Sequence, residues 1–144
     1  MPNSEHAAKL RGILAEIGAL QREYGGRALP YLRFYPQDFL FGARNFTAEE
    51  TGIYIRLLLH EADRGYLPSD PAQLADLAGV AASKLARLWP RRLQSKFVEI
   101  DAKLYSVRLE SERVRALRAA QRGSSAARGK RDKAPLADDA SAFD

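Results

Sequence analysis

The sequence contains no cysteine and only two histidines. The lack of cysteine excludes disulfide bonds, thiol nucleophiles and thiolate metal ligands. No run approaches the roughly 18 apolar residues that a membrane-spanning helix requires, and the N-terminus lacks the continuous apolar segment of a signal peptide. These absences predict a soluble, cytoplasmic protein.

Recognisable catalytic motifs are also missing. The two histidines, His6 and His60, are not at metal-ligand spacing, and without cysteine a zinc site would need carboxylates that are not clustered here. There is no Gly-rich phosphate loop, no GxSxG motif and no paired-carboxylate motif. We therefore expect a protein that is not an enzyme, with no catalytic residues, no cofactor and no metal site.

The net charge of +5 is modest, but its distribution along the chain is uneven. Residues 81–131 hold fourteen Lys or Arg against four acids, whereas residues 1–80 hold eight against ten. The last thirteen residues are acidic, with one lysine against four aspartates. A concentrated basic block predicts a polyanionic partner; the alternative is a merely solvated surface.

Residues 70–96 have the pattern of a helix-turn-helix. A short apolar-periodic segment ends at Gly79, and a second amphipathic segment begins two or three residues later. Two short helices joined by a tight turn that contains Gly, with cations on the second helix, are typical of a DNA-binding protein.

The second segment carries four polar side chains within an arc of about 80°, opposite Leu85, Trp89 and Leu93. Arg can pair with guanine and Gln with adenine in a major groove. Pro90 complicates the geometry, because it removes a helical hydrogen bond and pushes Trp89 away from α conformation. The alternative is a solvated helix in a protein-interaction module. The candidate DNA-binding residues are Lys84, Arg87, Arg91 and Gln94.

The chain after residue 96 predicts a β-hairpin and a last helix. Residues 98–100 and 104–109 alternate apolar with polar, joined by a short polar connection with Lys103 at its tip. The last helix is expected from Glu110 to about Gln121, with i,i+3 pairs Glu110–Arg113 and Glu112–Arg115. Cations in the hairpin and the last helix would strengthen binding to DNA phosphates, and added salt would weaken this contribution. The DNA-binding candidates here are Lys103, Arg115, Arg118 and Arg122.

Ser4 can cap a first helix that runs to about Tyr24, with an apolar residue every three or four positions. This helix could dimerise the chain as a coiled coil through residues 4–24, or lie on its own domain. We favour the second interpretation, because two heptads are short for an independent coiled coil.

In the middle of the chain, Thr47 and Glu50 form a capping box that opens a helix to about Asp63. Gly52 inside this helix predicts that another backbone packs close to it. Pro30 and Pro36 break any helix in the preceding segment. The aromatic residues at 34–46 could stack bases, but their few accompanying cations favour core packing.

The expected order is helix, extended link, helix, turn, helix, hairpin, helix. This order predicts a mainly α fold with a small β-hairpin, namely a winged helix-turn-helix in which Leu67 supplies the third strand. The expected organisation is an N-terminal amphipathic helix (1–26), a winged-helix domain (27–122) and a disordered, basic-then-acidic tail (123–144).

Residues 31–115 resemble the YdaU-like family of prophage and bacterial proteins, a domain of unknown function. The resemblance lies in FYPQDFL at 34–40, TAEE at 47–50 and GYLPSD at 65–70, followed in order by isolated apolar positions. The chain departs from the family pattern at Ala81, Leu85 and Ala102. The resemblance implies a winged-helix domain akin to the DNA-binding part of phage replication initiators, acting at the nucleoid of a bacterial host.

We therefore expect duplex DNA as the partner, in prophage replication initiation or its control. A replication protein, such as a helicase or its loader, is the expected partner if the domain is instead an interaction adaptor. Transcriptional repression is a third alternative, and a two-fold DNA site would then require a homodimer.

Overall fold

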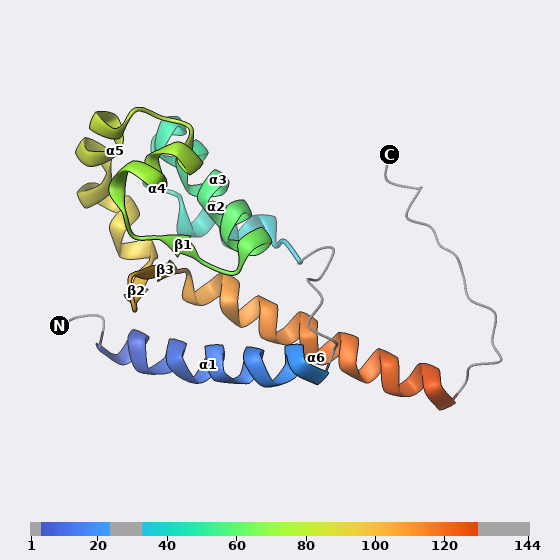
Figure 1. The fold of residues 1–144 in the computed structure, drawn as a ribbon. Coiled ribbons are helices and arrows are strands. Elements are labelled where there is room, and N and C mark those ends of the chain that lie inside the picture. The colour runs from blue at the N-terminus through green and yellow to red at the C-terminus, as the bar shows by residue number, and fades with distance from the viewer. Residues whose placement is uncertain (1–3, 24–32, 130–144) are drawn as a thin grey trace.

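The computed structural model describes residues 4–23 and 33–129. This part of the chain is mainly helical, with a small three-stranded antiparallel sheet (Figure 1). The elements in chain order are α1 (Ser4–Glu23), α2 (Pro36–Gly42), α3 (Ala48–Arg64), β1 (Leu67–Pro68), α4 (Pro71–Ala78), α5 (Ala82–Leu88), the π-helical turn η1 (Trp89–Leu93), the 3-10 turn η2 (Gln94–Lys96), β2 (Val98–Ile100), β3 (Lys103–Tyr105) and α6 (Val107–Gly129).

Helix α3 begins at the predicted capping box. The Glu50 amide donates to Thr47 Oγ1 at 3.1 Å, and the Thr47 amide donates to Glu50 Oε1 at 2.9 Å. The helix ends at Gly65, whose φ of 96° is left-handed. The prediction for Gly52 is wrong, because no atom outside its own helix lies within 4 Å of a Cβ built there. Gly52 is half-buried, and nothing packs closely against its backbone.

The two short helices predicted on either side of Gly79 are present as α4 and α5. The Asp70 carboxylate accepts the Gln73 amide at 3.0 Å, and Pro71 occupies the first turn, where it loses no helical hydrogen bond. Gly79 ends α4 with a left-handed φ of 77°, which an L side chain rarely adopts. The chain then turns into α5 through Ala81, which has no side chain that could cap the helix.

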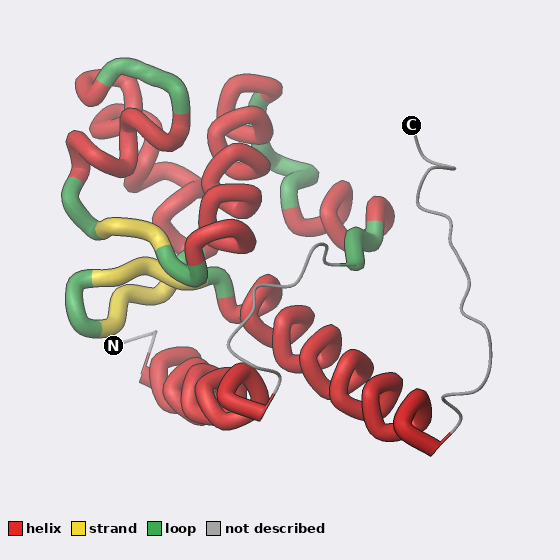
Figure 2. The backbone as a smooth tube through the Cα atoms, turned by 45° about the vertical axis from the view of Figure 1, so that its right-hand side comes forward, coloured by secondary structure: helices red, strands yellow, loops and turns green. Residues whose placement is uncertain are grey.

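The three strands form an antiparallel sheet in the order β1-β3-β2 (Figure 2). Leu67 pairs with Leu104 and Val98 with Tyr105, so the prediction that Leu67 belongs to a third strand is confirmed. The hairpin turn contains Asp101 and Ala102, both with positive φ.

The hairpin is shorter than predicted, because β3 ends at Tyr105 and α6 begins at Val107 rather than at Glu110. The Ser106 hydroxyl accepts the Leu109 amide at 3.2 Å and so caps a helix inside the predicted strand. Helix α6 also continues to Gly129, beyond the predicted end near Gln121, since the residues after Gly123 include good helix formers. Residues 130–144 of the predicted tail lie outside the described residues.

Helix α1 lies along α6 and against β2 (Figures 1 and 2). Leu10 is fully buried with Val98, Ile100 and Tyr105. Ile17, which follows Leu10 further along α1, is buried against Val114 and Leu117 of α6. The favoured interpretation of the first helix, that it lies on its own domain, is therefore confirmed.

The aromatic segment at 34–46 is only partly buried, which corrects the prediction of core packing. Phe39 and Phe46 contact the Tyr54 ring, with ring centroids 5.6 and 5.4 Å away. Leu40 and Phe41 are instead 69% and 64% exposed, with Phe34 and Tyr35 also exposed. The reason is the unpredicted helix α2, which Pro36 opens and which turns these side chains outward.

Candidate nucleic-acid interface

The segment from α5 to η2 has one buried and one exposed side, as the sequence predicts. Leu85, Leu88 and Leu93 are at most 5% exposed and belong to the main core. On the other side, Arg87, Arg91 and Gln94 are exposed. Neither of these arginines forms an ion pair within residues 4–23 and 33–129. Two free guanidinium groups and an amide therefore face solvent from one continuous helical segment.

Pro90 changes the helix type without breaking the helical path. α5 ends at Leu88, and the next five residues form a π turn in which the Gln94 amide donates to the Trp89 carbonyl. The prediction that Pro90 pushes Trp89 out of α conformation is wrong, because Trp89 has φ −55° and ψ −51°. The wider π turn accommodates the residue that has no amide hydrogen. Arg91 and Gln94 thus follow Arg87 along a continuous helical path that changes from α-helical to π-helical and then 3-10 geometry.

Two ion pairs anchor this segment to the N-terminal turn of α3. Lys84 pairs with Glu49, and Arg92 Nη1 donates to both carboxylate oxygens of Glu50 at 3.1 Å. Burial alone would raise the pKa of Glu50, but the Thr47 amide and Arg92 outweigh it and lower that pKa. Lys84 is therefore engaged with an acid, unlike Arg87. Arg92, which is absent from the predicted set, is a structural residue.

Lys103 lies at the hairpin turn, as predicted. Its ammonium group is 4.4 Å from the centroid of the Tyr66 ring, a cation–π contact. The residue stays exposed, so the contact orients the side chain and leaves the charge facing water. Lys103 is thus available to a phosphate near the sheet edge.

The three predicted arginines of α6 are in a different part of the molecule. Arg115 pairs with Glu112 at 2.9 Å, and Arg118 pairs with Glu16 of α1. Arg122 is exposed further along the same helix. Figure 1 shows α6 running away from the body that carries α5. The structure therefore does not gather the eight predicted residues on one face.

Sequence reasoning missed a second cationic group, consisting of Arg44, Lys96 and Arg108. Lys96 and Arg108 line the same cavity, and Arg44 and Lys96 lie over the rings of Phe41 and Phe46. Partial burial and then the charges of Arg108 and Arg44 lower the pKa of Lys96. Lys96 and Arg108 belong to the basic block and could have been flagged by charge alone. Arg44 is distant in the sequence, and no local pattern connects it to the other two.

A buried ionic cluster was also not predicted as such. Glu61 and Glu110 are 0% and 1% exposed, and Arg113 donates to Glu110 Oε1 at 2.9 Å and to the Glu61 carbonyl at 2.8 Å. The two i,i+3 pairs predicted for the last helix are both present. The Glu110–Arg113 pair is buried in the core, whereas its expected role was to support the helix at the surface.

The histidines are not brought into a site. His6 is exposed and His60 is half-buried. Within the described ranges, no three His, Asp or Glu side chains gather in a way that could hold a metal ion. In the same ranges, no helix combines the length and the apolar character needed to cross a bilayer.

Comparison with known proteins gives no assignment: no family model matches the sequence, and neither a curated protein nor a solved structure is significantly similar to it. The function therefore has to be argued from the residues and their geometry.

Proposed function

We propose that residues 47–105 form a winged helix-turn-helix that binds duplex DNA. The supporting topology is a capped helix α3, the strand β1, the pair α4–α5, and a hairpin whose second strand lies in the middle of the sheet. In this assignment the segment 82–96 is the recognition helix and the β2–β3 hairpin is the wing. A role in prophage replication initiation or its control remains the expected setting.

The observation that carries the proposal is the pair of free, exposed guanidinium groups on the outer side of residues 82–96. The inner side of the segment is fixed by buried leucines and by the Arg92–Glu50 ion pair. A rigid helical segment with cations on its free side can enter a major groove and contact phosphates and base edges. Lys103 on the wing would add a phosphate contact beside it.

The test is fluorescence anisotropy with a labelled duplex at several salt concentrations. Changing Lys84, Arg87 and Arg91 together to Glu should abolish binding. For the wild type, four to five neutralised phosphates predict a log–log salt slope of about −4. A matched control replaces Arg115, Arg118 and Arg122 with Glu, the same charge change on α6, and should weaken binding much less. Unchanged binding by the first variant would refute the recognition-helix assignment.

A second function, a protein-docking adaptor, is favoured by the exposed apolar side chains of α2. Leu40 and Phe41 are more than half exposed, and so is Phe34, whose ring centroid is 5.5 Å from that of Phe39. Such a cluster on a short helix is typical of a protein contact. Pull-down from nuclease-treated host extract separates the two functions: retention of a helicase or loader, lost in a Leu40→Asp, Phe41→Asp variant, favours the adaptor. Recovery that depends on DNA favours the DNA-binding protein.

A further inference from the structure

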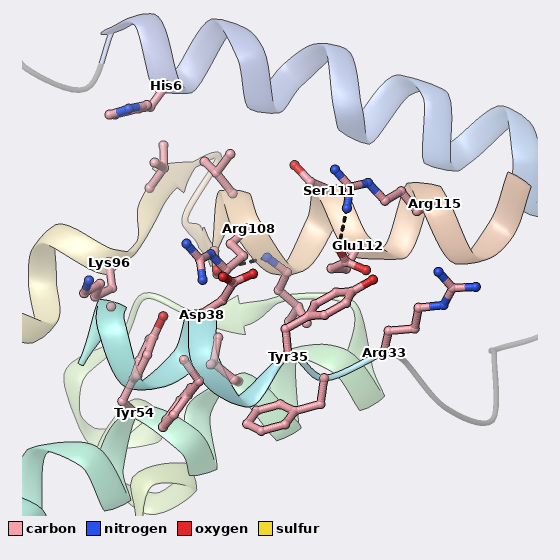
Figure 3. Close-up of a pocket in the computed structure, with 18 of the residues that line it drawn as sticks. His6, Arg33, Tyr35, Asp38, Tyr54, Lys96, Arg108, Ser111, Glu112 and Arg115 are labelled. Atoms are coloured by element: carbon pink, nitrogen blue, oxygen red, sulfur yellow. Dashed lines mark hydrogen bonds and ion pairs between the residues drawn. The ribbon is translucent and has the colours of Figure 1, made fainter. Parts of the chain in front are cut away.

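A cavity of about 510 Å³ lies where α1, α2, α3, η2 and the N-terminus of α6 meet (Figure 3). Small-molecule sites typically have volumes of about 300–1,000 Å³. The cavity is distinct from the proposed recognition helix, because neither Arg87 nor Arg91 lines it. Its walls come from segments that are distant in the sequence, so only the folded chain forms it.

Among the charged side chains that line the cavity, cations outnumber acids. Five Lys or Arg side chains line it against two acids, Asp38 and Glu112. Glu112 is already paired with Arg115 at 2.9 Å. Asp38 forms no ion pair with any cation in the described part of the chain. Lys9, Lys96 and Arg108 form no ion pair with a described side chain, so the cavity has an excess of positive charge.

Two of these three charges belong to Lys96 and Arg108. They come from η2 and from the first turn of α6, and Figure 3 shows both at the same end of the cavity. Neither pairs with an acid among the described side chains. Both line the cavity, and partial burial and then the charge of Arg108 lower the pKa of Lys96. A bound anion would relieve this repulsion.

Four aromatic side chains also line the cavity: Phe34, Tyr35, Phe39 and Tyr54. Tyr54 is 7% exposed, and its hydroxyl forms no hydrogen bond to another described residue. In Figure 3 this hydroxyl points toward the end that holds Lys96 and Arg108. Tyr35 is 40% exposed, and Figure 3 shows its ring further from Lys96 than Arg108 is. Two cations without an acid partner among the described side chains, with an exposed ring further along the wall, suit a ligand with an anionic end and a flat end.

We propose that this cavity binds a nucleotide, with its phosphate on Lys96 and Arg108 and its base against Tyr35. Arg and Lys are the usual phosphate ligands of proteins, and a phosphate monoester has the charge to neutralise both. An exposed tyrosine ring can stack any base. The nucleotide can be free, or it can be the 5′-terminal nucleotide of a phosphorylated strand; the chemistry of recognition is the same.

The first test is calorimetric titration of the full chain with AMP, inorganic phosphate and adenosine. AMP should bind, inorganic phosphate should compete with it, and adenosine should bind at least about tenfold more weakly, because it lacks the charge-assisted contacts. Absence of AMP binding at millimolar concentration, together with absence of binding by a 5′-phosphorylated dinucleotide, would overturn the proposal. Binding of only the dinucleotide assigns the cavity to strand ends, and binding of both probes assigns it to nucleotides in general.

Matched variants locate the site. Lys96→Gln with Arg108→Gln should weaken AMP binding at least about tenfold, since two contacts to a charged group are lost. Arg87→Gln with Arg91→Gln removes the same charge from α5 and should leave AMP binding unchanged. Asp38→Asn should tighten binding, because it removes the unpaired acid of the cavity. Equal AMP affinity in the first two variants would overturn the assignment.

A labelling experiment on the wild-type chain does not depend on whether the variants fold. An amine-reactive reagent is applied with and without AMP, and each modified lysine is quantified by mass spectrometry. AMP should slow the modification of Lys96 and leave that of Lys103, at the hairpin turn, unchanged. Equal protection of both lysines, or protection of neither, would refute the site.

Discussion

Lys84 has a suitable helical position for a DNA contact, and it also forms an ion pair with Glu49. Both side chains are partly exposed, at 39% and 44%. An exposed pair of this kind contributes about 0–1 kcal/mol, so DNA phosphates can compete for the lysine. Arg87 and Arg91 face no such competition, which makes them the stronger candidates at the scale of single residues.

Changing Glu49 to Gln should tighten binding to duplex DNA a few fold at low salt. The substitution releases Lys84 and removes a negative charge beside the proposed recognition helix, and an exposed ion pair of about 0.2–1 kcal/mol sets the size of the effect. Fluorescence anisotropy measures it. Asp63→Asn, at the far end of α3, is the control with the same charge change. Equal tightening in both variants would mean that only net charge matters.

Glu61 is a buried carboxyl group that lies next to another one, Glu110. Its two oxygens accept the Ser106 amide at 3.0 and 2.9 Å. Burial first, and then the hydrogen bond and charge of Glu110, raise the pKa of Glu61 well above 4.5. The folded state thus holds this proton more tightly than the unfolded chain. The resulting stability is fully present below the unfolded pKa and is lost as the pH rises through the folded pKa.

Thermal unfolding followed by circular dichroism from about pH 5 to about pH 8 tests this sign. The melting temperature of the wild type should fall with rising pH, and Glu61→Gln, which stays neutral, should flatten the dependence. Glu112→Gln is the control, because Glu112 is ion-paired with Arg115 near the surface. A wild-type slope that persists in Glu61→Gln would contradict the role of this carboxyl group.

At the scale of elements, two helix boundaries show what local sequence can and cannot predict. The start of α3 was predictable, because a capping box is a contact between residues three apart in the chain. The start of α6 was mispredicted, because Ser106 has no Glu or Gln at the box position and lies within an apolar-polar alternation typical of a strand. Ser106 also donates its amide to the distant Glu61, a contact that no local pattern encodes.

The backbone of Ala102, in the hairpin turn, has a strained conformation that a substitution by glycine can relieve. Its φ of 63°, after 54° at Asp101, is the left-handed pair that a two-residue hairpin requires. An L side chain in this region costs roughly 1–2 kcal/mol. Ala102→Gly should therefore raise the free energy of unfolding by about 1 kcal/mol.

Chemical denaturation measures this change. Ala86→Gly is the matched substitution at an exposed helical position of α5, and it should lower the free energy of unfolding by up to about 1 kcal/mol. A loss of stability in Ala102→Gly comparable to that in Ala86→Gly would show that the turn conformation is not the limiting feature.

At the scale of the whole molecule, α1 is part of the core. Leu10 of α1 is fully buried against the β2–β3 hairpin. The exposed Arg118–Glu16 ion pair joins α1 to α6. The apolar stripe of α1 is thereby buried within the same chain. Oligomeric state is then a separate question, which light scattering of the full chain answers.

Leu10→Ala should destabilise the protein by about 2–5 kcal/mol, the usual range for emptying a buried leucine site. Leu59→Ala is the control, because Leu59 is 63% exposed on α3 and its truncation leaves no cavity. Denaturant unfolding of the full chain measures both. If α1 were loosely attached, the two variants would have nearly equal stability.

The cationic sites show the limit of sequence reasoning at this scale. The periodicity of residues 82–96 correctly predicted that Leu85 and Leu93 are buried, because a helical face is a local property, whereas Trp89 on the same side is only partly buried. The same charge argument placed Arg115, Arg118 and Arg122 in one interface with Lys84, whereas α6 carries them elsewhere. Charge counts along a chain do not determine which cations meet in space.

The sequence by itself determined the caps of α3 and α4, the Gly79 turn and the amphipathic character of α5. Each depends on residues close together in the chain or on their repeat. Only the tertiary structure decided that Glu49 faces Lys84, that α2 turns Leu40 and Phe41 outward, and that Lys96 and Arg108 share a cavity. These outcomes depend on the packing of distant segments, which local periodicity does not encode.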